Sequence, residues 1–449
     1  MSVSSKSRRL SSGQLAVYAF PGLATAIPTI PVLVLLPQFY ATATTLTLSS
    51  IGIALLLARL FDMVTDPLVG TVIDAVPTRW GKRKPWIILG GLVCAPALLL
   101  LATPPESTSL WLLTGYLCLL YAGWTLFSVP YNALGAELST DGYERTRLAS
   151  SREGAVLCGI VMASALPVVL TQIGVPSTDQ FLAISWITIS LGAAAIILLG
   201  FRLVEPTNYL SLPKAEKIWK VEQLRSLIHN KPFTVIMACW FLNGLANGTG
   251  TVLFPFFLTD VLLTSETQKN LLIFLYFFMA IVGLPIWLLL NKRFNKSRLW
   301  LSSILIVSVT FTTVPFMSAG DVVPFAIVCV ITGFCLGADL ALPASLFADV
   351  TDWDELQSKH NRRSFLYSLW TLITKLSLAI AAGICLPLIS FWGFKTGEEN
   401  APETLTKLAI LYAMGPVCLK VGILLMMWNF PIGRKAQRAI QSRLRYRAL

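Results

Sequence analysis

Long apolar segments recur along the whole 449-residue chain. Each has about 20 residues or more, enough for a helix to cross the hydrocarbon core of a bilayer. Strands of a membrane barrel would instead alternate in polarity over about ten residues. The sequence therefore predicts an all-α integral membrane protein with twelve transmembrane helices, at about 13–37, 46–75, 84–103, 109–136, 152–174, 178–203, 231–262, 268–291, 297–319, 322–349, 364–391 and 404–430.

The formal net charge of +12 has a topological origin. Clusters of Lys and Arg precede the first span and follow the second, fourth, sixth, eighth, tenth and twelfth spans. The opposite loops hold only Lys269, Lys395 and Lys407. By the positive-inside rule, both termini are expected in the cytoplasm. The basic residues thus face the inner surface of the bilayer, and no nucleic-acid partner is expected.

The sequence lacks the residue patterns of enzymes, metal sites and disulfide frameworks. All eight cysteines fall inside predicted spans without a CxxC spacing, and are expected to pack as small apolar residues. His229 and His360 lie in cytoplasmic loops. No nucleophile–base pair and no GxxxxGK(S/T) phosphate loop is present. We therefore expect no enzymatic activity and no cofactor, and uphill transport would have to draw on an ion gradient.

The longest cytoplasmic loop divides six predicted helices from six. The predicted parts are an N-terminal six-helix bundle (1–203), a linker (204–230), a C-terminal six-helix bundle (231–430) and a basic tail (431–449). Aliphatic residues at helical spacing in the linker predict an amphipathic helix on the inner membrane face, with a solvated linker as the alternative. A weak repeat relates Leu134–Leu138 at the end of the fourth span to Leu346–Val350 at the end of the tenth. Parallel six-helix halves are typical of the major facilitator fold.

Asp62 and Asp66 lie inside the second span, where each carboxylate costs about 3 kcal/mol on insertion scales. Their i, i+4 spacing places both on one helix face, and Arg59 shares that face. Two carboxylates and one guanidinium attract a small hard cation, for which Thr65 and Thr125 would supply neutral oxygens. The alternative is a buried Arg–Asp network that only fastens helices together.

Three blocks of sequence resemble the glycoside–pentoside–hexuronide:cation symporters. The first runs from Arg59 to Trp86, the second from Glu144 to Gly154, and the third from Leu342 to Leu356, followed by Arg362-Arg363 and Lys375. The resemblance covers both halves. It implies that Asp62, Asp66 and Thr125 bind the coupling cation. Thr65 replaces an asparagine found in the family, which leaves Na⁺ and H⁺ both open.

The resemblance is weaker for the substrate. Galactoside permeases of the family hold sugar with carboxylates in the first and fourth helices, whereas the first span here has no charged residue and Ser128 replaces the acid of the fourth. Arg152 and Lys375 match family residues, which predicts an anionic substrate such as a uronide. A related lysophospholipid symporter makes a zwitterionic lipid the alternative, and Lys375 could instead neutralise the two aspartates. The predicted substrate residues are Arg152, Lys375, Ser128, Asn132, Tyr131 and Trp370.

Charged residues at the cytoplasmic helix ends predict an inner gate of ion pairs, or alternatively a solvated surface. Asp339 and Lys420 are further mid-span charges that would face the cavity or neutralise a neighbour. Together these features predict a monomeric, cation-coupled symporter of the plasma membrane; a membrane receptor with a transporter fold is the alternative. The predicted gating and structural residues are Arg59, Asp74, Arg79, Lys82, Arg83, Glu137, Arg145, Asp349, Asp354 and Arg363.

Overall fold

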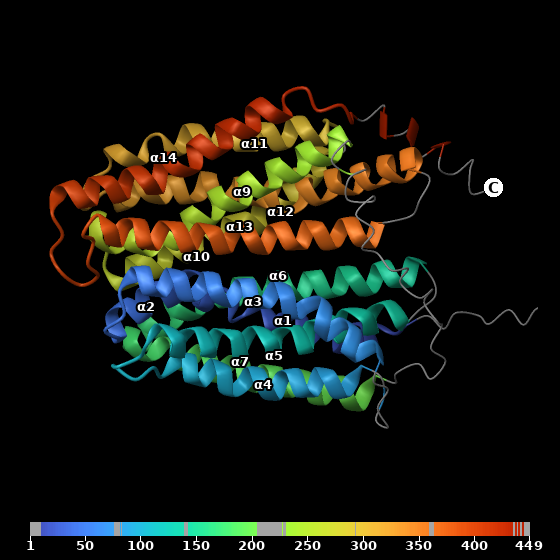
Figure 1. Cartoon of the computed structure of the whole chain (residues 1–449), viewed down its shortest axis with the longest axis horizontal. Coiled ribbons are helices and arrows are strands. Elements are labelled where there is room, and N and C mark those ends of the chain that lie inside the picture. Colours follow the sequence, from blue (N-terminus) through green and yellow to red (C-terminus); the bar gives the residue numbers. More distant parts are fainter. Residues whose placement is uncertain are drawn as a thin grey trace, which may run out of the picture. The chain divides into compact units, whose positions relative to one another are not determined.

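The structure is a computed structural model that describes residues 10–75, 81, 83–138, 142–203, 227, 230–291, 293–358, 363–433, 436–437, 439–440 and 442–443. The chain divides into two compact units, Met1–Lys214 and Ala215–Leu449. Within each unit the long helices run alongside one another (Figure 1). Most of the predicted amphipathic linker helix and the end of the basic tail lie outside the described residues.

The helices of the first unit begin with one that is interrupted near its end. A π-helical segment separates α1 from α2, in a stretch that contains Pro28, Pro31 and Pro37. Proline removes a backbone donor, so the regular α-helical pattern cannot continue through this stretch. The elements are α1 (Ser12–Ala26), η1 (Pro31–Leu35), α2 (Leu36–Ala43), α3 (Leu48–Ala75), α4 (Lys84–Ala102), α5 (Leu110–Glu137), α6 (Gly142–Gln172) and α7 (Ser177–Arg202).

The second unit starts in the same way, because α9 also ends in a π-helical segment, two residues after Pro255. The elements are α9 (Lys231–Phe256), η2 (Phe257–Val261), α10 (Glu266–Asn291), α11 (Lys296–Phe311), η3 (Val314–Phe316), α12 (Val322–Ser358), α13 (Arg363–Phe391) and α14 (Pro402–Met427).

Each predicted span is helical, and eleven helical segments among the described residues are long and apolar enough to cross a membrane. The exception is α9, which has 26 residues but carries Asn243 and Asn247. Of the helices that extend past their predicted spans, α6 and α12 do so by the most residues: α6 begins at Gly142 and α12 continues to Ser358. Hydropathy detects only the apolar part of a helix, so the sequence could not predict these polar extensions.

Five helix pairs that pack in the first unit have counterparts in the second. In the first unit α1 packs against α6 and α7, α5 against α3 and α4, and α4 against α7. In the second, α9 packs against α13 and α14, α12 against α10 and α11, and α11 against α14. These pairs correspond helix for helix, so the weak sequence repeat reflects a repeated architecture.

Glycines allow some of these pairs to approach closely. A Cβ at Gly90 would lie 2.4 Å from the backbone nitrogen of Phe127, and a Cβ at Gly283 would lie 2.3 Å from the backbone oxygen of Phe334. Each contact joins a helix to its main neighbour, α4 to α5 and α10 to α12. Small residues at such contacts are typical of helix packing in membranes.

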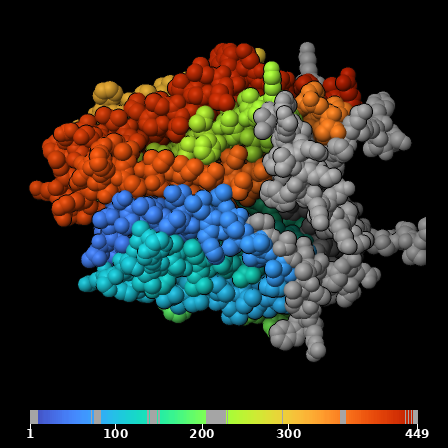
Figure 2. All heavy atoms as spheres, in the orientation of Figure 1, coloured from blue at the N-terminus to red at the C-terminus, as the bar shows by residue number. Residues whose placement is uncertain are grey.

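Many large apolar side chains remain exposed on the spanning helices, among them Leu92, Trp111, Phe201, Leu289 and Leu425. In the space-filling view, residues of α3 to α5, drawn in blue to teal, form much of the visible face of the first unit (Figure 2). A soluble protein rarely exposes this much contiguous apolar surface. Contact with bilayer hydrocarbon explains it.

Candidate cation and substrate sites

The two aspartates of α3 meet a threonine of α5. The side chain of Asp62 is 3% exposed. The hydroxyl of Thr125 lies 3.2 Å from Asp62 Oδ1 and 2.7 Å from Asp66 Oδ1. Three oxygens from two packed helices therefore converge. A hydroxyl has one hydrogen and can donate it to only one of the two carboxylates at a time.

Arg59 lies at the edge of this cluster. Its Nη1 is 3.6 Å from Asp62 Oδ2, and its guanidinium carbon lies 4.2 Å from the centre of the Tyr121 ring. The cation–π contact holds the arginine on the side of Asp62. Thr65 turns its hydroxyl to the backbone oxygen of Asp62 at 3.1 Å, so its hydrogen stabilises the helix. The predicted grouping of Arg59, Asp62, Asp66 and Thr125 is thus present in the structure.

A polar cavity of about 220 Å³ lies within the first unit, between α1, α5 and α6. Four of the predicted substrate residues line it: Ser128, Tyr131, Asn132 and Arg152. Arg152 donates a hydrogen bond to Asn132 Oδ1, and its Nη2 lies 2.6 Å from Glu153 Oε1. The arginine is therefore positioned at the cavity wall by two side chains.

Glu153 was not among the predicted site residues, although it follows Arg152 directly. Its side chain is 61% exposed, and it lines the same cavity. The cavity wall thus carries a carboxylate beside the guanidinium. The sequence places the two side by side, but consecutive residues of a helix point about 100° apart, so only the structure brings their charged ends together.

Tyr131 lines the cavity and also makes a packing contact between helices. It is 3% exposed, its hydroxyl donates to the backbone oxygen of Tyr18 at 2.6 Å, and the two rings are 5.1 Å apart. This contact ties α5 to α1 at the cavity wall. The hydrogen of Tyr131 is committed to the fold and is not offered to a ligand.

Two predicted substrate residues, Trp370 and Lys375, belong to α13 of the second unit. The Trp370 ring stacks on Trp240 of α9, with centroids 4.4 Å apart and an 11° interplanar angle, and lies 4.5 Å from the Phe347 ring. Trp240 Nε1 donates to Thr374 Oγ1 at 2.7 Å. Trp370 therefore belongs to an aromatic stack, and the partly buried Lys375 follows this stack along α13.

A buried charge pair joins four helices of the second unit. Asp339 of α12 and Lys420 of α14 are 8% and 3% exposed, and their charged atoms are 3.7 Å apart. Asn243 and Asn247 of α9 each donate to Asp339 Oδ2, at 3.2 and 3.1 Å, and accept from Lys420 Nζ, at 3.0 and 3.2 Å. Trp300 of α11 donates to Asp339 Oδ1 at 2.7 Å. Asp339 and Lys420 were predicted either to face the cavity or to neutralise a neighbour, and in the structure they neutralise each other. Their hydrogen bonds to Asn243 and Asn247 explain why α9 carries polar residues.

The predicted gate residues are described only in part. Asp349 lies 2.7 Å from Lys296 Nζ at the start of α11 and accepts from Gln437 Nε2 at 2.6 Å. Asp354 accepts from Asn230, which caps α9, at 2.9 Å. Arg83 is buried at the start of α4. Arg79 and Lys82, and the side chains of Asp74, Glu137, Arg145 and Arg363, lie outside the described residues.

Comparison with known proteins gives similarity over most of the chain. A profile of the family described as MFS/sugar transport protein matches residues 17–434. The human sodium-dependent lysophosphatidylcholine symporter 1 is 26% identical over 427 residues, spanning 87% of this chain and 77% of that protein. An uncharacterised symporter of Bacillus subtilis, YjmB, is 24% identical over 397 residues, spanning 85% and 84%.

Solved transporters share the fold at low sequence identity. The nucleoside transporter NupG superposes with a TM-score of 0.67 at 13% identity, covering 92% of this chain and all of that one. A D-xylose–proton symporter gives a TM-score of 0.63 at 14% identity, covering 93% of this chain and 97% of that one.

Proposed function

Because the chain belongs to the MFS/sugar transport protein family, we propose that it is a cation-coupled symporter of a small organic solute. Its fold is the all-α major facilitator fold that the sequence predicts. The single observation that supports cation coupling best is the convergence of Asp62, Asp66 and Thr125 inside spanning helices. Ionisable residues at such depth mark ion and substrate paths.

The coupling cation of this proposal binds between the two aspartates. Hard cations take oxygen ligands, and here two carboxylates and a hydroxyl provide them. The bound cation offsets the repulsion between Asp62 and Asp66, which favours the conformation that accepts substrate. Coupling is then the difference in ligand affinity between the two conformations. The name of the human relative favours Na⁺, and a proton shared by the aspartates is the second possibility.

The substrate of this proposal carries an anionic group that binds Arg152. A guanidinium presents paired donors that match a carboxylate or a phosphate. The bond to Glu153 is no obstacle, because a half-exposed ion pair contributes little and exchanges readily. Uronides fit this description. A lysophospholipid is the second candidate, favoured by the name of the human relative.

The remaining expectations follow from the sequence. The basic loops favour cytoplasmic termini in the plasma membrane. We propose that the protein acts as a monomer, without a cofactor and without enzymatic activity, and that the cation gradient supplies the energy.

The experiment uses purified protein and needs no known substrate. Na⁺ should raise the thermal unfolding temperature, whereas choline at equal ionic strength should not. Thr125→Val should raise the Na⁺ concentration needed for half of the stabilisation about tenfold, a loss of about 1.4 kcal/mol in binding free energy. Thr125→Ser should keep the wild-type Na⁺ dependence. The proposed coupling site is wrong if the wild type and the Asp66→Asn variant respond alike, in unfolding temperature, to Na⁺ and to a change in pH. A screen of uronides, glycosides and lysolipids with and without Na⁺ then identifies the substrate class.

A further inference from the structure

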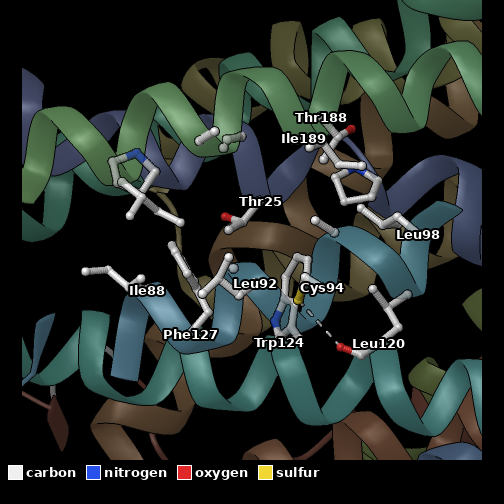
Figure 3. A pocket seen from close by; sticks show the side chains of 18 of the residues that line it. Thr25, Ile88, Leu92, Cys94, Leu98, Leu120, Trp124, Phe127, Thr188 and Ile189 are labelled. Carbon is white, nitrogen blue, oxygen red and sulfur yellow. Dashed lines mark hydrogen bonds between the residues drawn. The ribbon is translucent and has the colours of Figure 1, made fainter. Parts of the chain in front are cut away.

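A second cavity in the first unit is almost entirely apolar. It has a volume of about 340 Å³ and lies between α1, α4, α5 and α7. In Figure 3, side chains such as Leu92, Leu98 and Ile189 point into it from opposing helices. We call this cavity the apolar groove.

Three of the four polar side chains in the groove use their hydrogens within the helix bundle. Thr25 donates to the backbone oxygen of Gly22 at 3.0 Å, and Thr188 to that of Ile184 at 2.8 Å. The thiol of Cys94 points to the backbone oxygen of Leu120 at 3.7 Å (Figure 3). The fourth is Trp124. The groove therefore presents mainly methyl and methylene surface, which suits a hydrocarbon ligand.

The rim of the groove is open to the outside of the bundle. Ile88 and Leu92 of α4 are 43% and 66% exposed, and Ile197 of α7 is 56% exposed. Exposed apolar residues on spanning helices adjoin bilayer hydrocarbon. A chain can thus enter the groove from the bilayer without crossing a polar surface.

The groove adjoins the polar cavity. Thr25, Trp124 and Phe127 line both spaces, so the apolar groove and the cavity with Arg152 are adjacent compartments of one unit. A ligand that fills both must be apolar along its length and charged at one end. That is the chemistry of an amphiphile.

From this adjacency, we infer that the groove binds the hydrocarbon chain of a single-chain amphiphile whose phosphate or carboxylate headgroup binds Arg152. The inference rests on the proposed substrate cavity and narrows the substrate class. Within the bilayer the chain gains packing contacts along the groove, and Arg152 fixes the headgroup. A compact uronide would leave the groove without an occupant.

Gly192 of α7 provides the variant that tests the groove. It lines the groove, and a Cβ placed on it meets no atom within 4 Å, so Gly192→Leu fills the space without a clash at Cβ. Gly200→Leu is the matched control. Gly200 lies on the same helix, a Cβ there also meets no atom within 4 Å, and it does not line the groove.

The probes are lysophosphatidylcholines of graded chain length and chainless glycerophosphocholine, with binding measured as thermal stabilisation in nanodiscs. In the wild type, the rise in unfolding temperature at equal probe content of the bilayer should increase with chain length until the groove is full. Gly192→Leu should remove most of this dependence, leave glycerophosphocholine binding unchanged and keep the unliganded unfolding temperature. Gly200→Leu should behave as the wild type.

Two outcomes would overturn the inference. One is equal chain-length dependence in the wild type and Gly192→Leu, with a change only in stability, which would assign the groove to a bilayer lipid. The other is tighter binding of a uronide or of glycerophosphocholine than of any chain-bearing probe. Because this assay needs no ion gradient, a loss of cation coupling would sink the proposed symport while leaving the groove intact.

Discussion

Both units have charged side chains inside their spanning helices, but the ratio of acidic to basic groups differs between them. In the second unit one carboxylate, Asp339, faces one ammonium, Lys420, and the formal charges cancel. Asn243 and Asn247 bridge the pair, each as donor to one partner and acceptor from the other. The network is neutral, and its hydrogen bonds join α9 to α12 and α14.

In the first unit two carboxylates face one guanidinium. Arg59, Asp62 and Asp66 together carry a formal charge of −1, and the single hydroxyl hydrogen of Thr125 lies between the two acids. The comparison teaches how composition separates two roles. A cluster with matched charges and bridging amides fastens helices, whereas a cluster with excess negative charge and converging oxygens is suited to a cation.

The largest expected effect concerns the neutral network. Asp339→Asn should destabilise the protein by about 3–5 kcal/mol, because it leaves the Lys420 charge buried without its counter-charge. The double variant with Lys420→Gln should recover much of this loss. Thermal unfolding and size-exclusion chromatography measure both. Wild-type stability of the single variant would show that the network does not hold the four helices together.

The next effect concerns the negative cluster. Asp66→Asn should abolish cation-driven accumulation and weaken Na⁺ affinity at least about 100-fold, or about 2.7 kcal/mol, because it removes an anionic ligand. Asp62→Asn should strongly weaken cation-driven accumulation. Membrane insertion and stability without Na⁺ should persist, unlike in Asp339→Asn.

Vesicle uptake and Na⁺ titration measure this prediction, with Asp179→Asn as the control at an exposed position of the same unit. Full Na⁺- or H⁺-driven uptake by both aspartate variants would assign the first cluster to a fastening role as well.

A smaller effect separates two roles for Lys375. If this lysine binds the anionic group of the substrate, Lys375→Ala should raise the dissociation constant of the best ligand from the screen about tenfold, or about 1.4 kcal/mol. Lys407→Ala, at an exposed helix end, is the control. Unchanged substrate affinity together with tighter Na⁺ binding would instead make Lys375 a counter-charge for the aspartates, so that the first cluster would resemble the second.

The smallest effect concerns the cytoplasmic end of the second unit. Asp354→Asn should slow turnover several-fold and alter substrate binding less, because it removes a charge predicted to stabilise the closed inner gate. The measurement is labelling of Ser128→Cys, in a background without other cysteines, by a thiol reagent added from the cytoplasmic side. Unchanged labelling would favour a structural role, in which Asp354 mainly orients Asn230 at the cap of α9.

The sequence alone determined the elements and the local part of the cation site. The spanning helices follow from apolar length, with α9 the least clear, because a backbone in lipid must satisfy its own hydrogen bonds. The shared face of Arg59, Asp62 and Asp66 follows from helical spacing. Thr125 lies on another helix, so helical spacing could not place it; its prediction rested on its hydroxyl oxygen and on the family resemblance. The inner gate of ion pairs at the cytoplasmic helix ends stays a prediction.

The tertiary structure decided which side chains meet across helices. Thr125 approaches Asp66 because α3 packs on α5, and Asn243 reaches Asp339 because α9 lies near both α12 and α14. The same packing leaves a groove between α4 and α7. The hydropathy of these segments predicts apolar helices but not the groove between them. Local periodicity fixes the face on which a residue lies, but the neighbour of that face depends on contacts between segments distant in sequence, so only the packed helices reveal it.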